Sequence, residues 1–277
     1  LASSRRFLDS TPPRLLNLGP YTCLRTVKHR SAAMLDFHIT RLWESATATG
    51  LQPAARSESR SSLERRTTDT VTRTMKAFLS ANDDTEGGCP ECMVTVLYSE
   101  LPRPDLKKGR ANKGAEAKAS GLQGVKNLRI LAHAWPLSSP KHGTQISELD
   151  VLVAGSRRVL PEAKHSSWLR DRRPLDMLKA QARAQEILLC DTSPSPEGVT
   201  RRAVCEQFLL IFCRTGLTSN VFVVEEDGAV LTAPSGVLMG GMRQLCILAC
   251  EQEGIAVRLE SPDLSRARYW REAFLTG

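Results

Sequence analysis

One lysine stands in surroundings suited to carbonyl chemistry. Lys164 lies in Ala163-Lys164-His165-Ser166-Ser167-Trp168-Leu169-Arg170, and a second notable segment, Thr218-Ser219-Asn220-Val221-Phe222-Val223-Val224, follows farther along the chain. An amine attacks an aldehyde only when it is unprotonated, and free lysine titrates near ~10.4, so a reactive lysine must be desolvated or lie beside other cations. The apolar stretch from Leu149 to Leu160 offers desolvation, and four arginines lie nearby in sequence: Arg157, Arg158, Arg170 and Arg172.

Together the two segments resemble the fold-type IV family of pyridoxal phosphate enzymes, which includes branched-chain aminotransferases, D-amino acid aminotransferases and aminodeoxychorismate lyases. The resemblance implies that Lys164 forms the Schiff base with the cofactor and that the strand holding Ser219 and Asn220 passes beside it. The alternative is that Lys164 is one more solvated residue among the 38 lysines and arginines of the chain.

The start of the chain adds a candidate for binding the cofactor phosphate. An alternating strand is expected at Tyr21–Val27 and an amphipathic helix from about Asp36 to Ala48, containing His38-Ile39-Thr40-Arg41-Leu42. This resembles the family pattern His-x-x-Arg-Leu, which implies that Arg41 binds the phosphate; a guanidinium fork suits a phosphate dianion. The alternative is an ordinary surface arginine on a helix.

Two further segments match the family's cofactor-binding residues. Gly240-Gly241-Met242-Arg243 stands where family members have Gly-(Ile/Val)-Thr-Arg, so the backbone N–H groups of Gly240, Gly241 and Met242 are retained and the threonine hydroxyl is not. Thr276 and Gly277 match the beginning of the last phosphate-binding turn. The chain opens at Leu1 without methionine and stops at Gly277, which we take to indicate a fragment.

The sequence departs from the family where a glutamate should face the pyridine nitrogen. The family pattern Glu-Gly-x-x-x-Asn is here Thr215-Gly216-Leu217-Thr218-Ser219-Asn220, so Thr215 takes the place of the glutamate. A hydroxyl would hydrogen-bond a neutral pyridine and stabilise the substrate carbanion less. A separate Glu197-Gly198 precedes residues 199–214, which we interpret as an insert from a retained intron or other gene-model error. In that case Glu197 would face the nitrogen; the alternative is a genuine insertion, such as an extra packed helix.

The pattern of elements predicts two α/β domains, a small one over 1–160 and a larger cofactor-binding one over 161–277. Residues 102–124 are Gly-, Lys- and Ala-rich without periodicity, which predicts a mobile loop. Beyond 160 we expect a helix at Leu175–Ala184, a hairpin turning at Glu226-Asp227-Gly228, and a helix at Val237–Glu253 capped by Gly254. One face of that last helix should be buried: Leu238, Met242, Leu245 and Ala249.

Composition and charge bear on nucleic-acid binding, membrane insertion, the state of the cysteines and metal binding. The net charge of +8 would suit nucleic acid, but the basic runs at 56–73 and 107–126 contain no aromatics, which favours solvated loops over a nucleic-acid groove. No apolar run is long enough for a membrane span. Eight irregularly spaced cysteines indicate reduced thiols of a soluble intracellular protein, in the cytoplasm or an organelle stroma or matrix. The single CxxC, Cys89–Cys92, has no partner pair, so no metal site is expected.

We therefore interpret the chain as a two-domain fold-type IV protein that uses pyridoxal 5'-phosphate. The resemblance implies amino transfer between an amino acid and a 2-oxo acid, or a lyase-type elimination from an amino-substituted ring acid, in a homodimer. The alternatives are a degenerate family member without turnover and, from another class, a basic nucleic-acid-binding module.

Overall fold

A computed structural model describes residues 19–28, 31–51, 59–82, 90–100, 128–137, 148–192 and 211–277. Its contacts divide the chain into two compact units, which we call the N-terminal and the C-terminal unit. The C-terminal unit comprises Asp36–Arg41 and Ser139–Gly277, and the N-terminal unit the rest of the chain up to Ser138. The predicted domain boundary at residue 160 stays a prediction, and the predicted mobile loop at 102–124 lies outside the described residues.

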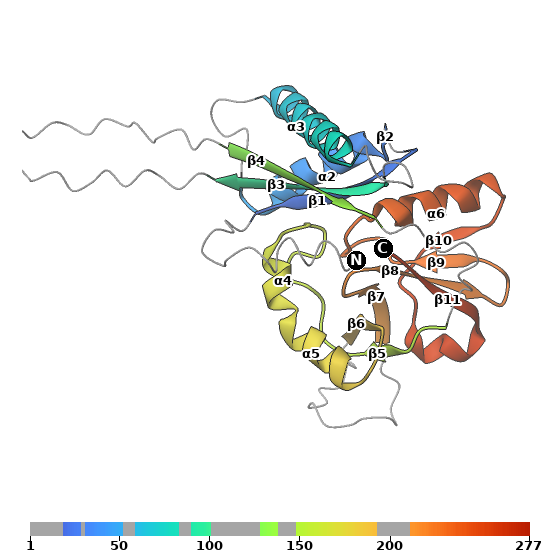
Figure 1. Cartoon of the computed structure of the whole chain (residues 1–277). Coiled ribbons are helices and arrows are strands. Elements are labelled where there is room, and N and C mark those ends of the chain that lie inside the picture. Colours follow the sequence, from blue (N-terminus) through green and yellow to red (C-terminus); the bar gives the residue numbers. More distant parts are fainter. Residues whose placement is uncertain are drawn as a thin grey trace, which may run out of the picture. The chain divides into compact units, whose positions relative to one another are not determined.

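The N-terminal unit is an antiparallel sheet with two helices on one face. The strands are β1 Tyr21–Val27, β2 Ser31–Ala32, β3 Cys92–Glu100 and β4 Leu128–Pro136, in the order β2-β1-β3-β4. The helices are α2 Leu35–Ala48, of which Leu42–Ala48 belongs to this unit, and α3 Arg60–Ala81 (Figure 1). The expected first strand and the helix expected from about Asp36 to Ala48 are confirmed.

The core of this unit is formed by residues that alternate along the strands and by residues at helical spacing on α2 and α3. Leu24 of β1 lies opposite Val94 of β3, and alternate β3 residues face the helices because successive strand side chains point to opposite faces. Thr67 of α3 and the buried Tyr98 share a hydrogen bond of 2.7 Å between their hydroxyls. The buried cluster contains Leu24, Leu42, Ala46, Leu63, Val71, Met75, Cys92, Val94, Val96 and Tyr98.

The C-terminal unit is built on a larger mixed sheet. Its strands are β5 Val151–Val153, β6 Glu186–Thr192, β7 Ile211–Gly216, β8 Asn220–Glu225, β9 Val230–Thr232, β10 Val257–Leu259 and β11 Trp270–Thr276. The order is β10-β9-β8-β7-β6-β5, with β11 antiparallel to β8; β5–β6 and β9–β10 pair in parallel. The helices are α4 Ser167–Asp171, α5 Arg173–Gln181 and α6 Gly241–Gln252, and a 3-10 helix spans η1 Leu264–Tyr269 (Figure 1).

The hairpin between β8 and β9 turns where the sequence predicted. The Gly228 N–H donates to the Glu225 carbonyl at 2.9 Å, and Gly228 has a φ of 85°, in the left-handed region that glycine adopts without strain. Gly254 likewise follows α6 with a φ of 70°, and the next amide, Ile255, donates to Cys250 at 2.8 Å. The predicted turn and the predicted C-cap are both confirmed.

The predicted buried face of α6 is wrong. Met242 and Leu245 are 51% and 41% exposed, and Leu248 is exposed as well. The helix begins at Gly241, and the apolar residues of its inner face pack against Phe222 and Val230. The sequence offers two apolar stripes, and the one that is buried contains an arginine: Arg243, Cys246, Ile247 and Cys250.

The expected insert overlaps a strand of the sheet. Residues 199–210 lie outside the described residues, but Ile211–Arg214 form the first part of β7, which pairs with β6. Within it, Cys213 is buried and packs with Leu188 and Val221. The insert itself stays a prediction, but its last four residues belong to a strand that pairs within the sheet.

Across the described ranges, helices are either too short or too polar to cross a membrane. Six cysteines lie in those ranges, and no disulfide joins any two of them: Cys23, Cys92, Cys190, Cys213, Cys246 and Cys250.

Candidate active site

Asn220, at the start of β8, gathers several of the predicted cofactor-binding residues. It lies opposite Thr215 on β7 and opposite Thr276 on β11. Its amide nitrogen donates to the Leu238 carbonyl at 2.8 Å, and a Cβ placed on Gly240 would lie 2.3 Å from its amide oxygen. The side chain is buried, so Asn220 fixes the loop before α6 against the central sheet, and only glycine fits at position 240.

The turn between β7 and β8 separates its side chains onto two faces. Thr215 and Asn220 are directly opposite residues, so their side chains share a face, whereas Gly216 and Ser219 point to the other face. On that other face the Ser219 hydroxyl donates to Glu186 Oε2 at 2.8 Å, and the Thr218 hydroxyl donates to the same oxygen at 3.3 Å. The structure thus directs Thr215 and Asn220 to one side and ties the Ser219 hydroxyl to a buried carboxylate on the other.

The hydroxyl of Thr215 is already committed as a donor. It lies 2.6 Å from the Ser219 carbonyl oxygen and 3.1 Å from the Gly216 carbonyl oxygen. A hydroxyl has one proton, so the Thr215 oxygen can only accept a hydrogen bond from a further partner on its face, through a lone pair.

The N-terminus of α6 presents backbone donors. Gly240 is the N-cap and has no side chain to cap the first turn, so the N–H groups of Gly241 and Met242 lack intrahelical partners. Arg243 is buried beneath this turn: its Nη2 donates to the Ala233 carbonyl at 2.8 Å, and burial lowers its pKa. The buried Thr276 hydroxyl finds no hydrogen-bond partner among the described residues.

Arg41 lies at the same helix terminus. It is buried on α2, and its Nη1 donates to the Met239 carbonyl at 3.2 Å, one residue before the N-cap of α6. Its Nη2 lies 3.1 Å from His38 Nδ1 and must be the donor, because arginine cannot accept. His38 therefore carries its proton on Nε2.

His38 contacts Arg41 and lies within electrostatic reach of the predicted catalytic lysine. Burial, followed by the charges of Arg41 and Lys164, lowers the His38 pKa from 6.5 to about 3. Arg41, His38 and Lys164 all belong to the C-terminal unit.

Lys164 lies in the loop that follows the apolar run 149–160. Within that run only Val151–Val153 forms a strand, and it ends before Gly155. Gly155 has a φ of 81°, and a Cβ at this position would lie against the side chains of Leu175 and Leu189. The loop that follows is tied to the loop before α6, because the Gly236 N–H donates to Glu162 Oε1 at 3.1 Å.

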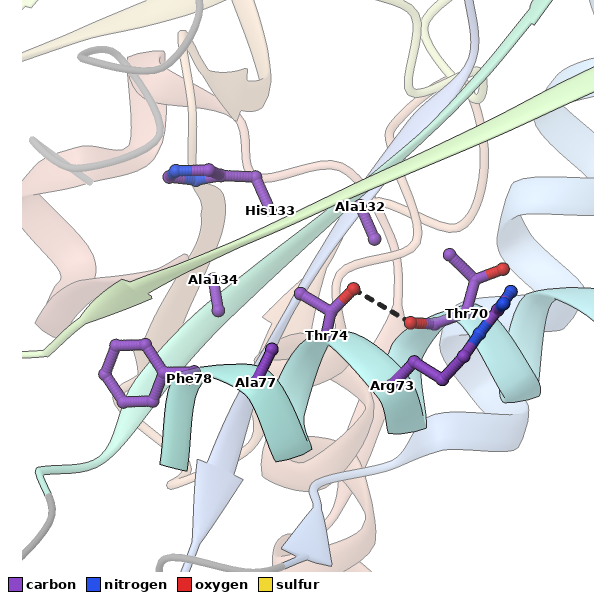
Figure 2. A pocket seen from close by; sticks show the side chains of 8 residues that line it. All are labelled: Thr70, Arg73, Thr74, Ala77, Phe78, Ala132, His133 and Ala134. Carbon is purple, nitrogen blue, oxygen red and sulfur yellow. Dashed lines mark hydrogen bonds between the residues drawn. The ribbon is translucent and has the colours of Figure 1, made fainter. Parts of the chain in front are cut away.

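A groove of about 510 Å³ in the N-terminal unit contains none of these residues. It lies between α3 and β4, and Figure 2 shows its floor of small side chains, Ala77, Ala132 and Ala134, with Phe78 at one end. The Thr74 hydroxyl in it already donates to the Thr70 carbonyl at 2.8 Å (Figure 2). Because none of the residues predicted to bind the cofactor lines this groove, we place the candidate site in the C-terminal unit.

Three buried groups of the site had no role assigned to them from sequence. Glu186 begins β6 and supports the turn that carries Thr215, Arg243 holds the loop before α6, and His38 touches Arg41. Each is a charged or titratable residue inside an otherwise apolar stretch or a matched motif. A charged residue in such surroundings must find hydrogen-bond partners if it is buried, and this is the sequence signal that could have identified the three residues.

No family model and no curated protein matches this sequence. Solved structures do. A PLP-bound hypothetical aminotransferase from Mycobacterium tuberculosis has a TM-score of 0.63 at 15% identity, covering 95% of this chain and 78% of that one. A fold IV transaminase from Curtobacterium pusillum has 0.62 at 17%, covering 97% and 80%, and a putative 4-amino-4-deoxychorismate lyase from Legionella pneumophila has 0.59 at 15%, covering 99% and 81%.

Branched-chain aminotransferases are also among the matching structures, at 18% identity. Identities this low establish the fold alone. The chain therefore has the mixed α/β fold of the fold-type IV enzymes, and the fold predicted from Lys164 and the Ser219-Asn220 strand is confirmed.

The burial of His38 predicts a loss of stability in mild acid. The folded-state pKa of about 3 lies below the unfolded value of 6.5, so the unfolded chain takes up the proton first and stability falls as pH drops from 6.5 towards 3. By pH 4.5 the free energy of unfolding should have fallen by about 2 kcal/mol through this residue. Urea unfolding at pH 7 and pH 4.5 measures the difference. His38→Gln should remove that part of the loss and His133→Gln, on β4, should not; equal losses in all three proteins would contradict the assignment.

Proposed function

We propose that this chain binds pyridoxal phosphate in the C-terminal unit and uses Lys164 as its catalytic amine. The observation that supports this most directly is the position of Arg41, which is buried at the N-terminus of α6 and contacts His38, whose pKa the charge of Lys164 helps to lower. A phosphate-binding group and an amine within one cluster are what a phosphorylated aldehyde requires.

The phosphate end of the proposed site fits the donors present. An anion is stabilised by the unpaired N–H groups at a helix N-terminus and by the helix dipole. Here the N–H groups of Gly240, Gly241 and Met242, the Arg41 guanidinium and the Thr276 hydroxyl are proposed to bind the phosphate, with Gly277 continuing that turn beside Ser219. The Thr276 hydroxyl, buried without a partner among the described residues, is explained by such a ligand.

The proposed chemistry divides between the cofactor and the chain. When bound, pyridoxal phosphate supplies an aldehyde that condenses with amines and a ring that delocalises the electron pair left by the substrate α-proton. Lys164 would hold the cofactor through its Nζ, and the same amine, when free, would take the proton from the substrate Cα. His38, neutral and protonated on Nε2, adds no further positive charge beside Arg41 and Lys164.

Thr215, on the same face as Asn220, is proposed to lie at the ring nitrogen. Because its proton goes to the Ser219 carbonyl, it can accept a hydrogen bond from a protonated nitrogen and cannot donate to a neutral one. Ser219 lies on the other face of the turn, and its proposed role is indirect, through its hydrogen bond to Glu186.

The reaction proposed is amino transfer between an amino acid and a 2-oxo acid, or the lyase-type elimination, in a homodimer. Structures related in fold include both kinds of enzyme, a transaminase and a putative 4-amino-4-deoxychorismate lyase. A chain that binds the cofactor without turnover is the second candidate, favoured by the neutral Thr215.

Titration of the purified chain with pyridoxal phosphate, followed by borohydride reduction and peptide mass spectrometry, tests the proposal. We expect visible absorbance of bound cofactor and a covalent adduct on the peptide containing Lys164. A chain that acquires neither would show that the proposal is wrong. Activity with amino acids and 2-oxo acids then separates the enzyme from the inactive family member.

Arg41→Ala should weaken cofactor binding far more than Arg66→Ala. A charge-assisted hydrogen bond is worth about 1.5–3 kcal/mol, or about 10- to 100-fold in the dissociation constant, whereas an exposed arginine contributes little. Arg66 lies on α3 and donates to the Leu128 carbonyl at 3.1 Å, so its loss controls for removing an arginine. Cofactor titration by absorbance measures both constants, and equal values would exclude the phosphate role.

A further inference from the structure

The backbone on both sides of Lys164 is held by side chains. Before it, Arg158 Nη2 donates to the Ala163 carbonyl at 3.0 Å. After it, His165 Nδ1 accepts the Ser167 N–H at 3.2 Å, and the Trp168 N–H donates to the His165 carbonyl at 3.2 Å, which starts α4. The lysine therefore lies between two fixed peptide groups.

Trp168 links this loop to the turn between β7 and β8. Its indole Nε1–H donates to the Leu217 carbonyl at 3.0 Å. Leu217 is 2% exposed and packs with Ile187 and Leu189, so the acceptor belongs to a rigid part of the sheet. The same turn carries Thr215 and Asn220 at its two ends.

Arg158 and Trp168 also contact each other. The Arg158 guanidinium lies over the indole ring, with Cζ 4.6 Å from the ring centroid. A planar guanidinium can stack on an aromatic face and donate in its own plane at once, which a lysine ammonium cannot. One arginine thus binds the Ala163 carbonyl and orients the indole that reaches Leu217.

We propose that Arg158 and Trp168 are positioning residues that fix Lys164 relative to the Leu217 turn. The inference rests on the proposed function, since it assigns the pair the task of holding Lys164 where the cofactor aldehyde meets it. A small misplacement of a reacting group has a large effect on rate because orientation supplies much of the effective concentration.

Trp168→Phe tests the pair, because phenylalanine keeps a ring under Arg158 and removes only the donor to Leu217. We expect the rate of borohydride trapping of pyridoxal phosphate on Lys164 to fall about tenfold, the size of one hydrogen bond, with little change in melting temperature. Arg158→Lys should have a comparable effect. If the two residues act as one unit, the double variant is no slower than the slower single variant.

The N-terminal unit offers a matched control. There Arg60 lies over the ring of Trp43, with Cζ 5.8 Å from the centroid, and both residues belong to the N-terminal unit. Trp43→Phe and Arg60→Lys should leave trapping on Lys164 unchanged. Equal trapping in Trp168→Phe and the parent chain, or equal slowing by Trp43→Phe, would overturn the positioning role.

A cofactor-free measurement separates this inference from the proposed function. Reductive methylation with formaldehyde labels lysines, and the ratio of Lys164 to Lys179, on α5, reports how firmly the loop holds its amine. We expect Trp168→Phe to raise that ratio severalfold, as Lys164 gains access to solvent, while Trp43→Phe leaves it constant. An unchanged ratio contradicts the positioning role even if the chain binds no cofactor; a raised ratio without any trapping in the parent chain would reject the proposed function alone.

Discussion

Replacing Lys164 with alanine is expected to abolish covalent attachment of pyridoxal phosphate completely. The amine is the only group of the proposed site that can form a bond to the aldehyde, because Arg41 and Arg243 are guanidinium groups that stay protonated. The variant should still bind the phosphate end, since Arg41 and the α6 terminus are untouched. Absorbance of bound cofactor and borohydride reduction followed by mass spectrometry measure both properties.

Lys179→Ala is the matched control for this prediction. Lys179 lies on α5 with its Nζ donating to the Gln185 carbonyl at 3.3 Å, so it is a nearby amine in sequence with a structural contact of its own. We expect it to trap cofactor as the parent chain does. A reducible adduct that persists in Lys164→Ala, or that disappears in Lys179→Ala, would move the catalytic amine to another lysine.

The part of the fold predictable from sequence is the part where one pattern dominates. In β1 burial alternates as expected, with Thr22, Leu24 and Thr26 on the buried face, and in the β8–β9 hairpin Gly228 has the positive φ that suits glycine. Arg41 was predictable for a similar reason, because it repeats a spaced motif within an amphipathic helix. Local pattern and tertiary structure agree at these positions.

α6 shows why the rest was not predictable. Its two stripes of apolar residues score alike by spacing, and the buried stripe contains Arg243, which spacing alone assigns to solvent. Burial of Arg243 is stabilised by acceptors outside the helix, the Ala233 carbonyl and the Met239 sulfur, and sequence periodicity does not report such partners. The contact between Glu186 and Ser219 is hidden in the same way, since 32 residues lie between them.

The surroundings of Gly216 indicate where a deletion of the expected insert should end. A Cβ at this position would lie 2.2 Å from the Ser219 hydroxyl oxygen and 3.0 Å from the Glu186 carboxyl carbon, so the position requires glycine. Gly198 can supply it if Val199–Gly216 is removed, because Glu197-Gly198 then joins Leu217-Thr218-Ser219-Asn220 directly. Glu197 would take the place of Thr215, on the face shared with Asn220.

Deleting residues 199–216 is therefore expected to raise amino transfer by about 100-fold if the segment is an untrimmed insert. A carboxylate in place of Thr215 would hold a proton on the ring nitrogen and so stabilise the charge that develops in the transition state; one such electrostatic contact is worth on the order of 10²-fold. If the segment is genuine, the deletion removes β7, with buried Cys213 and its pairing to β6, and the melting temperature falls. A thermal melt and a steady-state rate, each set against the full chain, distinguish the two.

Two further variants isolate the carboxylate from the deletion itself. Deleting only residues 199–214 keeps Thr215-Gly216 next to Leu217, so it shortens the chain without placing a charge at the ring position, and Glu197→Gln in the longer deletion keeps the length and removes the charge. Both should bind cofactor, and neither should reach the rate of the longer deletion with Glu197 intact. Equal rates in all three would show that the identity of this residue does not limit the reaction, and a lower melting temperature together with weaker cofactor binding in all three would show that residues 199–214 belong to the fold.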